Sequence, residues 1–81
     1  MTVEERVKNV LFKTTLKDVD PSEINNKSIL YEYGVGLDSV ATLEMIVELE
    51  VEFQVRIDET EITPETFLTI ENITKYIAPK L

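Results

Sequence analysis

The chain has 81 residues, with 16 Asp or Glu against 8 Lys or Arg, so its formal net charge at pH 7 is −8. This length fits a single domain over residues 1–81 with a modest core. The absence of both Cys and His excludes disulfides, catalysis by a thiol or an imidazole, and the usual zinc ligands. The excess of carboxylates argues against nucleic acid as a partner and favours partners with basic docking surfaces.

Other features of the composition bear on where such a protein works. A hydrophobic fraction of 43% is too high for a disordered acidic tail, so we expect a folded chain. No stretch approaches the roughly 18 apolar residues of a membrane span. The segment Met1–Glu5 has no basic region before an apolar core, which is unlike a signal peptide. We expect no membrane span and a cytoplasmic protein, for which the lack of Cys is suitable.

The first element in chain order is a helix that begins at Thr2. Thr2 and Glu5 have the spacing of a capping box, and an apolar stripe follows from Val3 until the pattern fades near Leu16. A long connection then runs from about residue 17 to residue 38. It holds turn-forming residues, among them Pro21, and long loops in small domains are often functional.

A second helix is predicted over Ser39–Phe53, which contains no Gly or Pro. It carries two apolar stripes about 150° apart on a helical wheel. We expect one stripe to face the core, namely Met45, Ile46, Leu49 and Phe53. The other is flanked by Glu44, Glu48 and Glu50 and consists of Val40, Leu43, Val47 and Val51. Either this second stripe faces a partner, or the helix is central and both stripes are buried.

The remaining sequence predicts a short turn of helix with Thr63 as its cap, followed by a last helix from about Thr69 that ends before Pro79. The alternating segment 51–57 has no pairing partner, so no strand is expected. The predicted fold is therefore all-α: a bundle of three main helices plus one short helix, with a long first loop.

Asp38 and Ser39 precede the second helix, and both residue types are favoured as helix caps. Both can serve only as capping residues, or one can cap while the other presents its side chain for modification. A phosphate ester at this point would be stabilised by the free backbone N–H groups and the helix dipole. With no His in the chain, Ser39 cannot be the nucleophile of a usual catalytic triad. We expect no catalytic residue and no metal site.

The segment Gly36–Val40, which reads Gly-Leu-Asp-Ser-Val, resembles the attachment motif of acyl carrier proteins and the related peptidyl carrier domains. Residues 39–53 and 61–70 are also similar to that family, so the resemblance covers nearly the whole chain. It implies an acyl-carrier-type bundle in which Ser39 carries 4′-phosphopantetheine, transferred from coenzyme A by a phosphopantetheinyl transferase, and Asp38 assists recognition. The resemblance also implies that five side chains contact partner enzymes: Val40, Leu43, Glu44, Val47 and Glu50.

Ala41 and Val51 replace acidic residues of many fatty-acid carriers, which favours a specialised member of the family. The resemblance implies a non-catalytic, monomeric carrier that delivers acyl intermediates of fatty-acid, lipid or polyketide-type biosynthesis. Its partners would be enzymes of the ketosynthase, acyl transferase or acyl ligase type. Two alternatives remain open: a peptidyl or aminoacyl carrier, and an acidic interaction module that carries nothing, in which Ser39 is only a cap.

Overall fold

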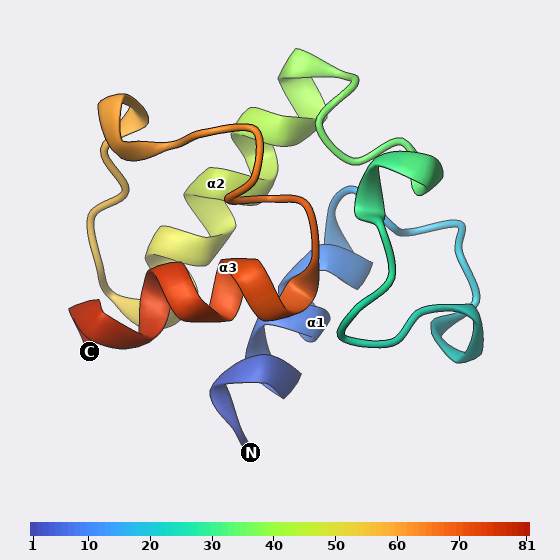
Figure 1. The fold of residues 1–81 in the computed structure, drawn as a ribbon, viewed down its shortest axis with the longest axis horizontal. Helices are drawn as coiled ribbons and strands as arrows, with labels where there is room; N and C mark the ends of the chain where they lie inside the picture. Colours follow the sequence, from blue (N-terminus) through green and yellow to red (C-terminus); the bar gives the residue numbers. More distant parts are fainter.

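The computed structural model describes residues 1–81 and contains helices but no strand (Figure 1). The three α-helices are α1 (Val3–Lys13), α2 (Ser39–Phe53) and α3 (Ile70–Ile77). Four short 3₁₀ turns complete the fold: η1 (Pro21–Glu23), η2 (Leu30–Tyr33), η3 (Glu59–Glu61) and η4 (Ala78–Lys80). The all-α prediction is confirmed. No helix is both long enough and apolar enough to cross a membrane.

The start of α1 is the predicted capping box. Thr2 Oγ1 accepts a hydrogen bond of 3.1 Å from the backbone N–H of Glu5 and donates its own proton to the Glu5 carboxylate. The helix ends at Lys13, before Leu16, where the apolar pattern fades. The N–H of Leu16 donates to the carbonyl of Leu11 at 2.8 Å, and this turn brings the Leu16 side chain into the core. Leu16 thus belongs to the core without belonging to the helix.

The core lies between α1 and the other two helices, because α1 packs against both α2 and α3. Its buried apolar side chains form one cluster. The helices contribute Val7, Val10 and Leu11 from α1, Met45, Leu49 and Phe53 from α2, and Ile70, Ile73 and Ile77 from α3. The segments between the helices contribute the rest: Leu16, Ile24, Leu30, Val35 and Ile57. With a third of its core supplied by connecting segments, this domain depends on those segments for stability.

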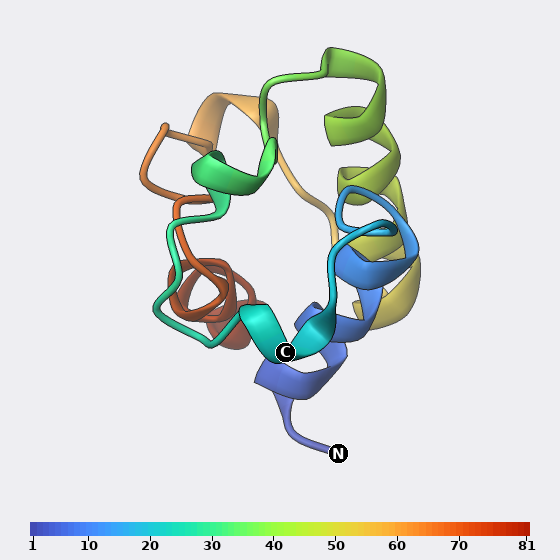
Figure 2. The same cartoon turned by 90° about the vertical axis from the view of Figure 1, so that its right-hand side faces the viewer.

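The long connection between α1 and α2 is an ordered part of the fold, and Figure 2 views the molecule from its side. Two backbone hydrogen bonds join it to the start of α3 and the residues just before: Leu30 N donates to the Leu68 carbonyl at 2.9 Å, and Glu71 N donates to the Asn26 carbonyl at 3.0 Å. Together with the buried side chains of Ile24 and Leu30, these bonds fix the path of the chain toward the start of α2.

The prediction of a short helix that starts at Thr63 is wrong, because the chain forms a turn there. Thr66 N donates to the Thr63 carbonyl at 3.0 Å, while Thr66 Oγ1 accepts from Thr63 N at 3.1 Å. Leu68 N donates to the Glu65 carbonyl at 3.2 Å, so residues 63–68 form successive turns and no helix develops from them. The short element lies earlier, at η3. The last helix agrees with prediction: Thr69 caps α3 by accepting from Asn72 N at 3.0 Å.

Candidate functional site

The path into α2 is set by the two glycines of the chain. Gly34 and Gly36 have φ angles of 91° and 88°, in the left-handed region where a side chain would be strained. Gly34 ends η2, with its N–H directed at the carbonyls of Leu30 and Tyr31. The second left-handed residue then turns the chain outward, so that Leu37 is 64% exposed at the start of α2.

Asp38 is the cap of α2 and Ser39 is the first residue of the helix. Asp38 Oδ1 accepts hydrogen bonds from Val40 N at 2.9 Å and from Ala41 N at 3.2 Å. This arrangement leaves the Ser39 hydroxyl outside the cap, on an exposed residue. Both sequence alternatives are compatible with this geometry, in which Asp38 caps the helix and the Ser39 side chain is exposed. An incoming enzyme can reach this hydroxyl, and an anion attached to it would meet the positive end of the helix dipole.

An open depression of about 410 Å³ lies beside Ser39. Its apolar wall is formed by Leu37, Leu43 and Ile46, and its polar wall by Ser39, Thr42 and Glu59. Glu59 belongs to η3, so the depression is bounded by α2 on one side and by the segment after α2 on the other. A narrow flexible group with carbon-rich stretches and a few polar atoms fits these walls, because they offer both apolar surface and hydrogen-bonding side chains.

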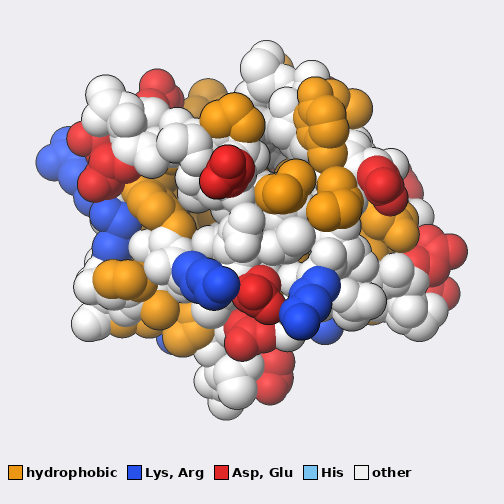
Figure 3. Space-filling view, viewed as in Figure 1, with side chains coloured by type: hydrophobic (Ala, Val, Ile, Leu, Met, Phe, Trp, Pro, Cys, Tyr) orange, Lys and Arg blue, Asp and Glu red, His pale blue; other side chains and the backbone are white.

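The second stripe of α2 lies on the surface. Val40, Leu43, Val47 and Val51 are between 46% and 74% exposed, whereas Leu49 and Met45 on the opposite stripe are fully buried. The alternative in which both stripes are buried is therefore wrong. Apolar side chains gather on the upper right of the face in Figure 3, where α2 begins and the long connection reaches it. A row of exposed aliphatic side chains on one stable helix is typical of a surface that meets another protein.

The carboxylates beside this stripe differ in their surroundings. Glu44 is exposed and points into solvent, while Glu48 is half-buried. Glu50 is also half-buried, and its Oε2 accepts a hydrogen bond of 2.9 Å from the backbone N–H of Ile57. Glu50 thus anchors the segment that follows α2. Sequence reasoning missed this anchor, although a carboxylate in the last turn of a helix is unfavourable to the helix dipole and for that reason suggests a partner.

The other end of that segment is tied to α3. Glu61 Oε1 accepts hydrogen bonds from Tyr76 Oη at 3.1 Å and from Lys80 Nζ at 3.3 Å. Burial, followed by the bond to Glu61, raises the pKa of Tyr76 above its ordinary value. The hydrogen bond to Glu61 likewise raises the pKa of Lys80. We call residues 54–62 the strap: it runs from the Glu50 anchor to the Glu61 cluster and carries η3.

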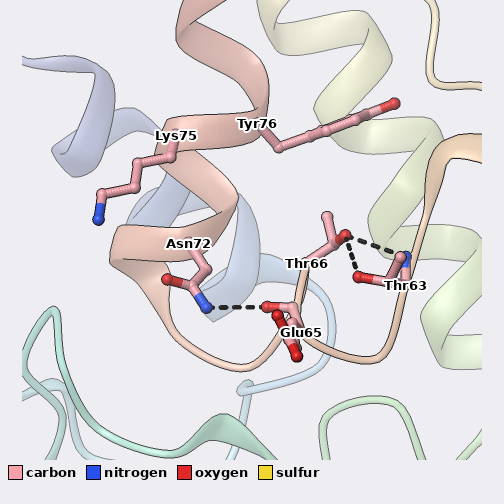
Figure 4. A pocket seen from close by; sticks show the side chains of 6 residues that line it. All are labelled: Thr63, Glu65, Thr66, Asn72, Lys75 and Tyr76. Atoms are coloured by element: carbon pink, nitrogen blue, oxygen red, sulfur yellow. Dashed lines mark hydrogen bonds between the residues drawn. The ribbon is translucent and has the colours of Figure 1, made fainter.

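A second open depression, of about 290 Å³, lies between the Thr63 turn and α3 (Figure 4). Asn72 Nδ2 donates to the carbonyl of Glu65 at 2.9 Å, which braces the turn against the helix. The side chains of Lys75 and Tyr76 extend away from one another, so no set of polar groups converges here.

No three metal-ligating side chains anywhere in the chain come together as a candidate metal site.

Comparisons with known proteins identify the family of the chain. Residues 7–77 match a protein family described as the phosphopantetheine attachment site. A D-alanyl carrier protein of Streptococcus uberis is 37% identical over 73 residues, covering 90% of this chain and 87% of the relative. An acyl carrier protein of Desulforapulum autotrophicum is 30% identical over 80 residues, covering 99% of each chain.

Two further similarities extend over nearly the whole chain. An aminoacyl carrier protein of Bradyrhizobium diazoefficiens is 26% identical over 81 residues, covering 100% of this chain and 89% of the relative. The solution NMR structure of a holo acyl carrier protein from Nitrosomonas europaea superposes with a TM-score of 0.82 at 28% identity, covering 99% of this chain and 96% of that one.

Proposed function

The chain belongs to the phosphopantetheine attachment family of carrier proteins, and from this premise we propose that Ser39 is the residue that bears the cofactor, in a single carrier domain over residues 1–81. The cofactor of the family is 4′-phosphopantetheine. The observation that supports Ser39 is its position: an exposed first residue of α2, whose hydroxyl is left outside a cap made entirely by Asp38.

When attached, the cofactor supplies a thiol on a long flexible arm, which a chain without Cys lacks. The residues around Ser39 would assist recognition by the transferase and stabilise the attached group. Asp38 fixes the start of the helix and offers a carboxylate to the phosphopantetheinyl transferase, while the backbone N–H groups of the first turn stabilise the negative charge of the phosphodiester. The chain acts as a substrate of the transferase and as a carrier, with no catalytic residue of its own.

Docking to partner enzymes is assigned to the exposed stripe of α2. Val40, Leu43 and Val47 offer apolar contact, and Glu44 offers a charge for Lys or Arg on the partner. With a net charge of −8, the whole chain is attracted to basic docking surfaces, which speeds encounter without requiring tight binding. A carrier that visits several enzymes needs this combination. We propose that this chain is a monomer and that it works in the cytoplasm.

For the cargo, we propose acyl intermediates of fatty-acid, lipid or polyketide-type biosynthesis, which partners of the ketosynthase, acyl transferase or acyl ligase type would process. A second candidate is an amino acid such as D-alanine, because the D-alanyl carrier protein of Streptococcus uberis is 37% identical to this chain. Both share the same attachment chemistry. Membership of a carrier family speaks against the remaining alternative, an interaction module that carries nothing.

The attachment is tested by intact-protein mass spectrometry after incubation with coenzyme A and a phosphopantetheinyl transferase of broad specificity. The wild type gains the mass of one phosphopantetheine and Ser39→Ala gains none. Asp38→Asn keeps a capping oxygen but loses the charge, whereas Asp38→Ala loses both. A slower reaction of Asp38→Asn with unchanged thermal stability assigns the Asp38 charge to recognition. A mass gain that persists in Ser39→Ala contradicts the assignment of the site.

The cargo is tested by offering the loaded protein to two purified ligases. One is an acyl ligase supplied with fatty acids of different lengths and ATP, and the other is a D-alanine-activating ligase supplied with D-alanine and ATP. Formation of the fatty-acyl thioester at the higher kcat/KM supports acyl cargo. A higher kcat/KM for D-alanine replaces that proposal with the aminoacyl one.

A further inference from the structure

Tyr31 in η2 is the only aromatic residue of the chain whose side chain is largely exposed to solvent. It is 60% exposed, while the other aromatic residues are buried or half-buried. Tyr33, two residues later in the same turn, packs against the core, and its hydroxyl donates to the Glu23 carbonyl at 3.4 Å. A tyrosine ring offers a large contact area with few rotatable bonds, so an exposed one is suited to contact with another protein.

The backbone that carries Tyr31 is held in place by the fold. The Tyr31 carbonyl accepts from Gly34 N at 3.1 Å, and Leu30 N donates to the Leu68 carbonyl at 2.9 Å. The side chains of Leu30 and Val35 are buried in the core. Because this segment is already ordered, a partner that binds the Tyr31 ring has little more than one side chain to immobilise.

η2 lies close enough to Ser39 for one partner to contact both. Residues 34–38 alone separate Tyr33, the last residue of η2, from Ser39, so their Cα atoms are at most about 22 Å apart. Figures 1 and 2 both place η2 in the upper half of the molecule, together with the start of α2. A typical interface covers about 800 Å² on each partner, or roughly 30 Å across. A protein that reaches Ser39 can therefore contact Tyr31 as well.

The charge of this part of the chain indicates the chemistry of the partner. Residues 28–55 contain no Lys or Arg but six Asp or Glu. On the upper right of the face in Figure 3, apolar side chains and carboxylates are visible with no Lys or Arg among them. The contacts between a cation and an aromatic ring within the chain involve the rings of Phe53 and Tyr76. The face of the Tyr31 ring is thus left for a cation that a partner supplies.

We propose that Tyr31 is a docking residue for the phosphopantetheinyl transferase, and that an arginine of the transferase stacks on the Tyr31 ring while the enzyme acts on Ser39. The inference rests on the proposed function, because it needs transfer to Ser39. Coenzyme A carries a diphosphate and a further phosphate, and Arg is suited to binding such groups. Arg also stacks on aromatic faces, and the acidic surroundings of Tyr31 attract it. Tyr31 thereby extends the docking surface beyond α2.

The experiment measures the kinetics of phosphopantetheine transfer from coenzyme A to unloaded variants, followed by intact mass. Tyr31→Phe keeps the aromatic ring, Tyr31→Leu keeps an apolar side chain without a ring, and Tyr31→Ala removes both. Leu81→Ala is the matched control, because it removes a side chain that is 58% exposed at the C-terminus, which Figures 1 and 2 place in the lower half of the molecule.

We expect the KM for the carrier to rise about five- to tenfold in Tyr31→Ala and about three- to fivefold in Tyr31→Leu. We expect Tyr31→Phe and Leu81→Ala to stay within about twofold of the wild type, because the first keeps the ring and the second lies outside the docking surface. The value of kcat and the melting temperature should be unchanged in all four variants, since Tyr31 is exposed and takes no part in the transfer step.

Three results overturn the proposal. A KM for Tyr31→Ala equal to that of the wild type shows that the transferase does not contact this residue. A KM for Tyr31→Leu equal to that of Tyr31→Phe shows that the contact needs no ring and thus no stacked arginine. A rise in Leu81→Ala as large as in Tyr31→Ala shows a general effect of removing exposed apolar surface. Failure of the proposed function is distinguishable from these: the wild type then gains no mass, or Ser39→Ala gains it, and this inference falls with the attachment site.

Discussion

A substitution of Glu50 tests whether this carboxylate stabilises the fold, in contrast to the exposed Glu44 on the same helix. Its Oε2 accepts the Ile57 N–H at 2.9 Å and ties the strap to the last turn of α2. A hydrogen bond to a charged acceptor contributes about 2 kcal/mol. Removing a carboxylate from the negative end of a helix relieves a repulsion and stabilises the fold by about 0.5 kcal/mol. We therefore expect Glu50→Ala to lower the free energy of unfolding by about 1.5 kcal/mol, a decrease in melting temperature of about 6–12 °C for a domain of this size.

The matched control is Glu44→Ala, which removes the same charge from the same helix at an exposed position. We expect its free energy of unfolding to change by less than about 0.5 kcal/mol. Urea unfolding of both variants, followed by circular dichroism at 222 nm with the slopes compared, measures the difference. Equal midpoints for Glu50→Ala and Glu44→Ala would refute the reasoning, because any general effect of lowering the negative charge is common to both variants.

Three further predictions concern docking, pH and the core. Glu44→Lys should slow cargo transfer by about two- to fivefold at low salt without changing the helical signal, as measured by transfer kinetics at two salt concentrations. The fold raises the pKa values of Tyr76 and Lys80, so the stability that the two groups contribute is present below their ordinary pKa values and is lost as the pH rises through the raised ones. In an alkaline titration followed by tyrosine absorbance, Tyr76 should ionise above a pH of about 10, and the amide signals of the strap should change with it. Leu49→Ala should cost about 3 kcal/mol in urea unfolding and Val51→Ala less than about 0.5 kcal/mol.

Elements whose limits are set by local interactions could be predicted from the sequence. The bounds of α2 agree with prediction because a carboxylate cap precedes Ser39 and fifteen residues without Gly or Pro follow. The starts of α1 and α3 agree because Thr2 and Thr69 each accept a backbone N–H in the first turn. The sequence also predicted the two apolar stripes of α2 and which of them faces the core, but only the structure shows that the second stripe is exposed.

Features that depend on contacts between distant segments could not be predicted. Pro64 after Thr63 is typical of a helix start, but the chain forms turns there, and Leu68 at the end of this segment accepts a backbone hydrogen bond from the distant Leu30. The role of Glu50 depends on where Ile57 returns, seven residues later, and the helical pattern alone does not fix that path.

The proposed attachment residue and the proposed docking stripe lie on the same helix. Under the proposed function, a partner that contacts Val51 at one end of α2 therefore fixes the origin of the arm at Ser39, about 18 Å away at the other end. α2 can transmit this position because α1 holds its far end: Arg6 Nε pairs with the Glu52 carboxylate at 2.7 Å, Arg6 Nη2 donates to the Glu52 carbonyl at 2.8 Å, and the guanidinium lies over the Phe53 ring. The exposed stripe offers only aliphatic and acidic contacts and nothing specific to one cargo, so under the proposed function we expect the partner enzymes to select the cargo.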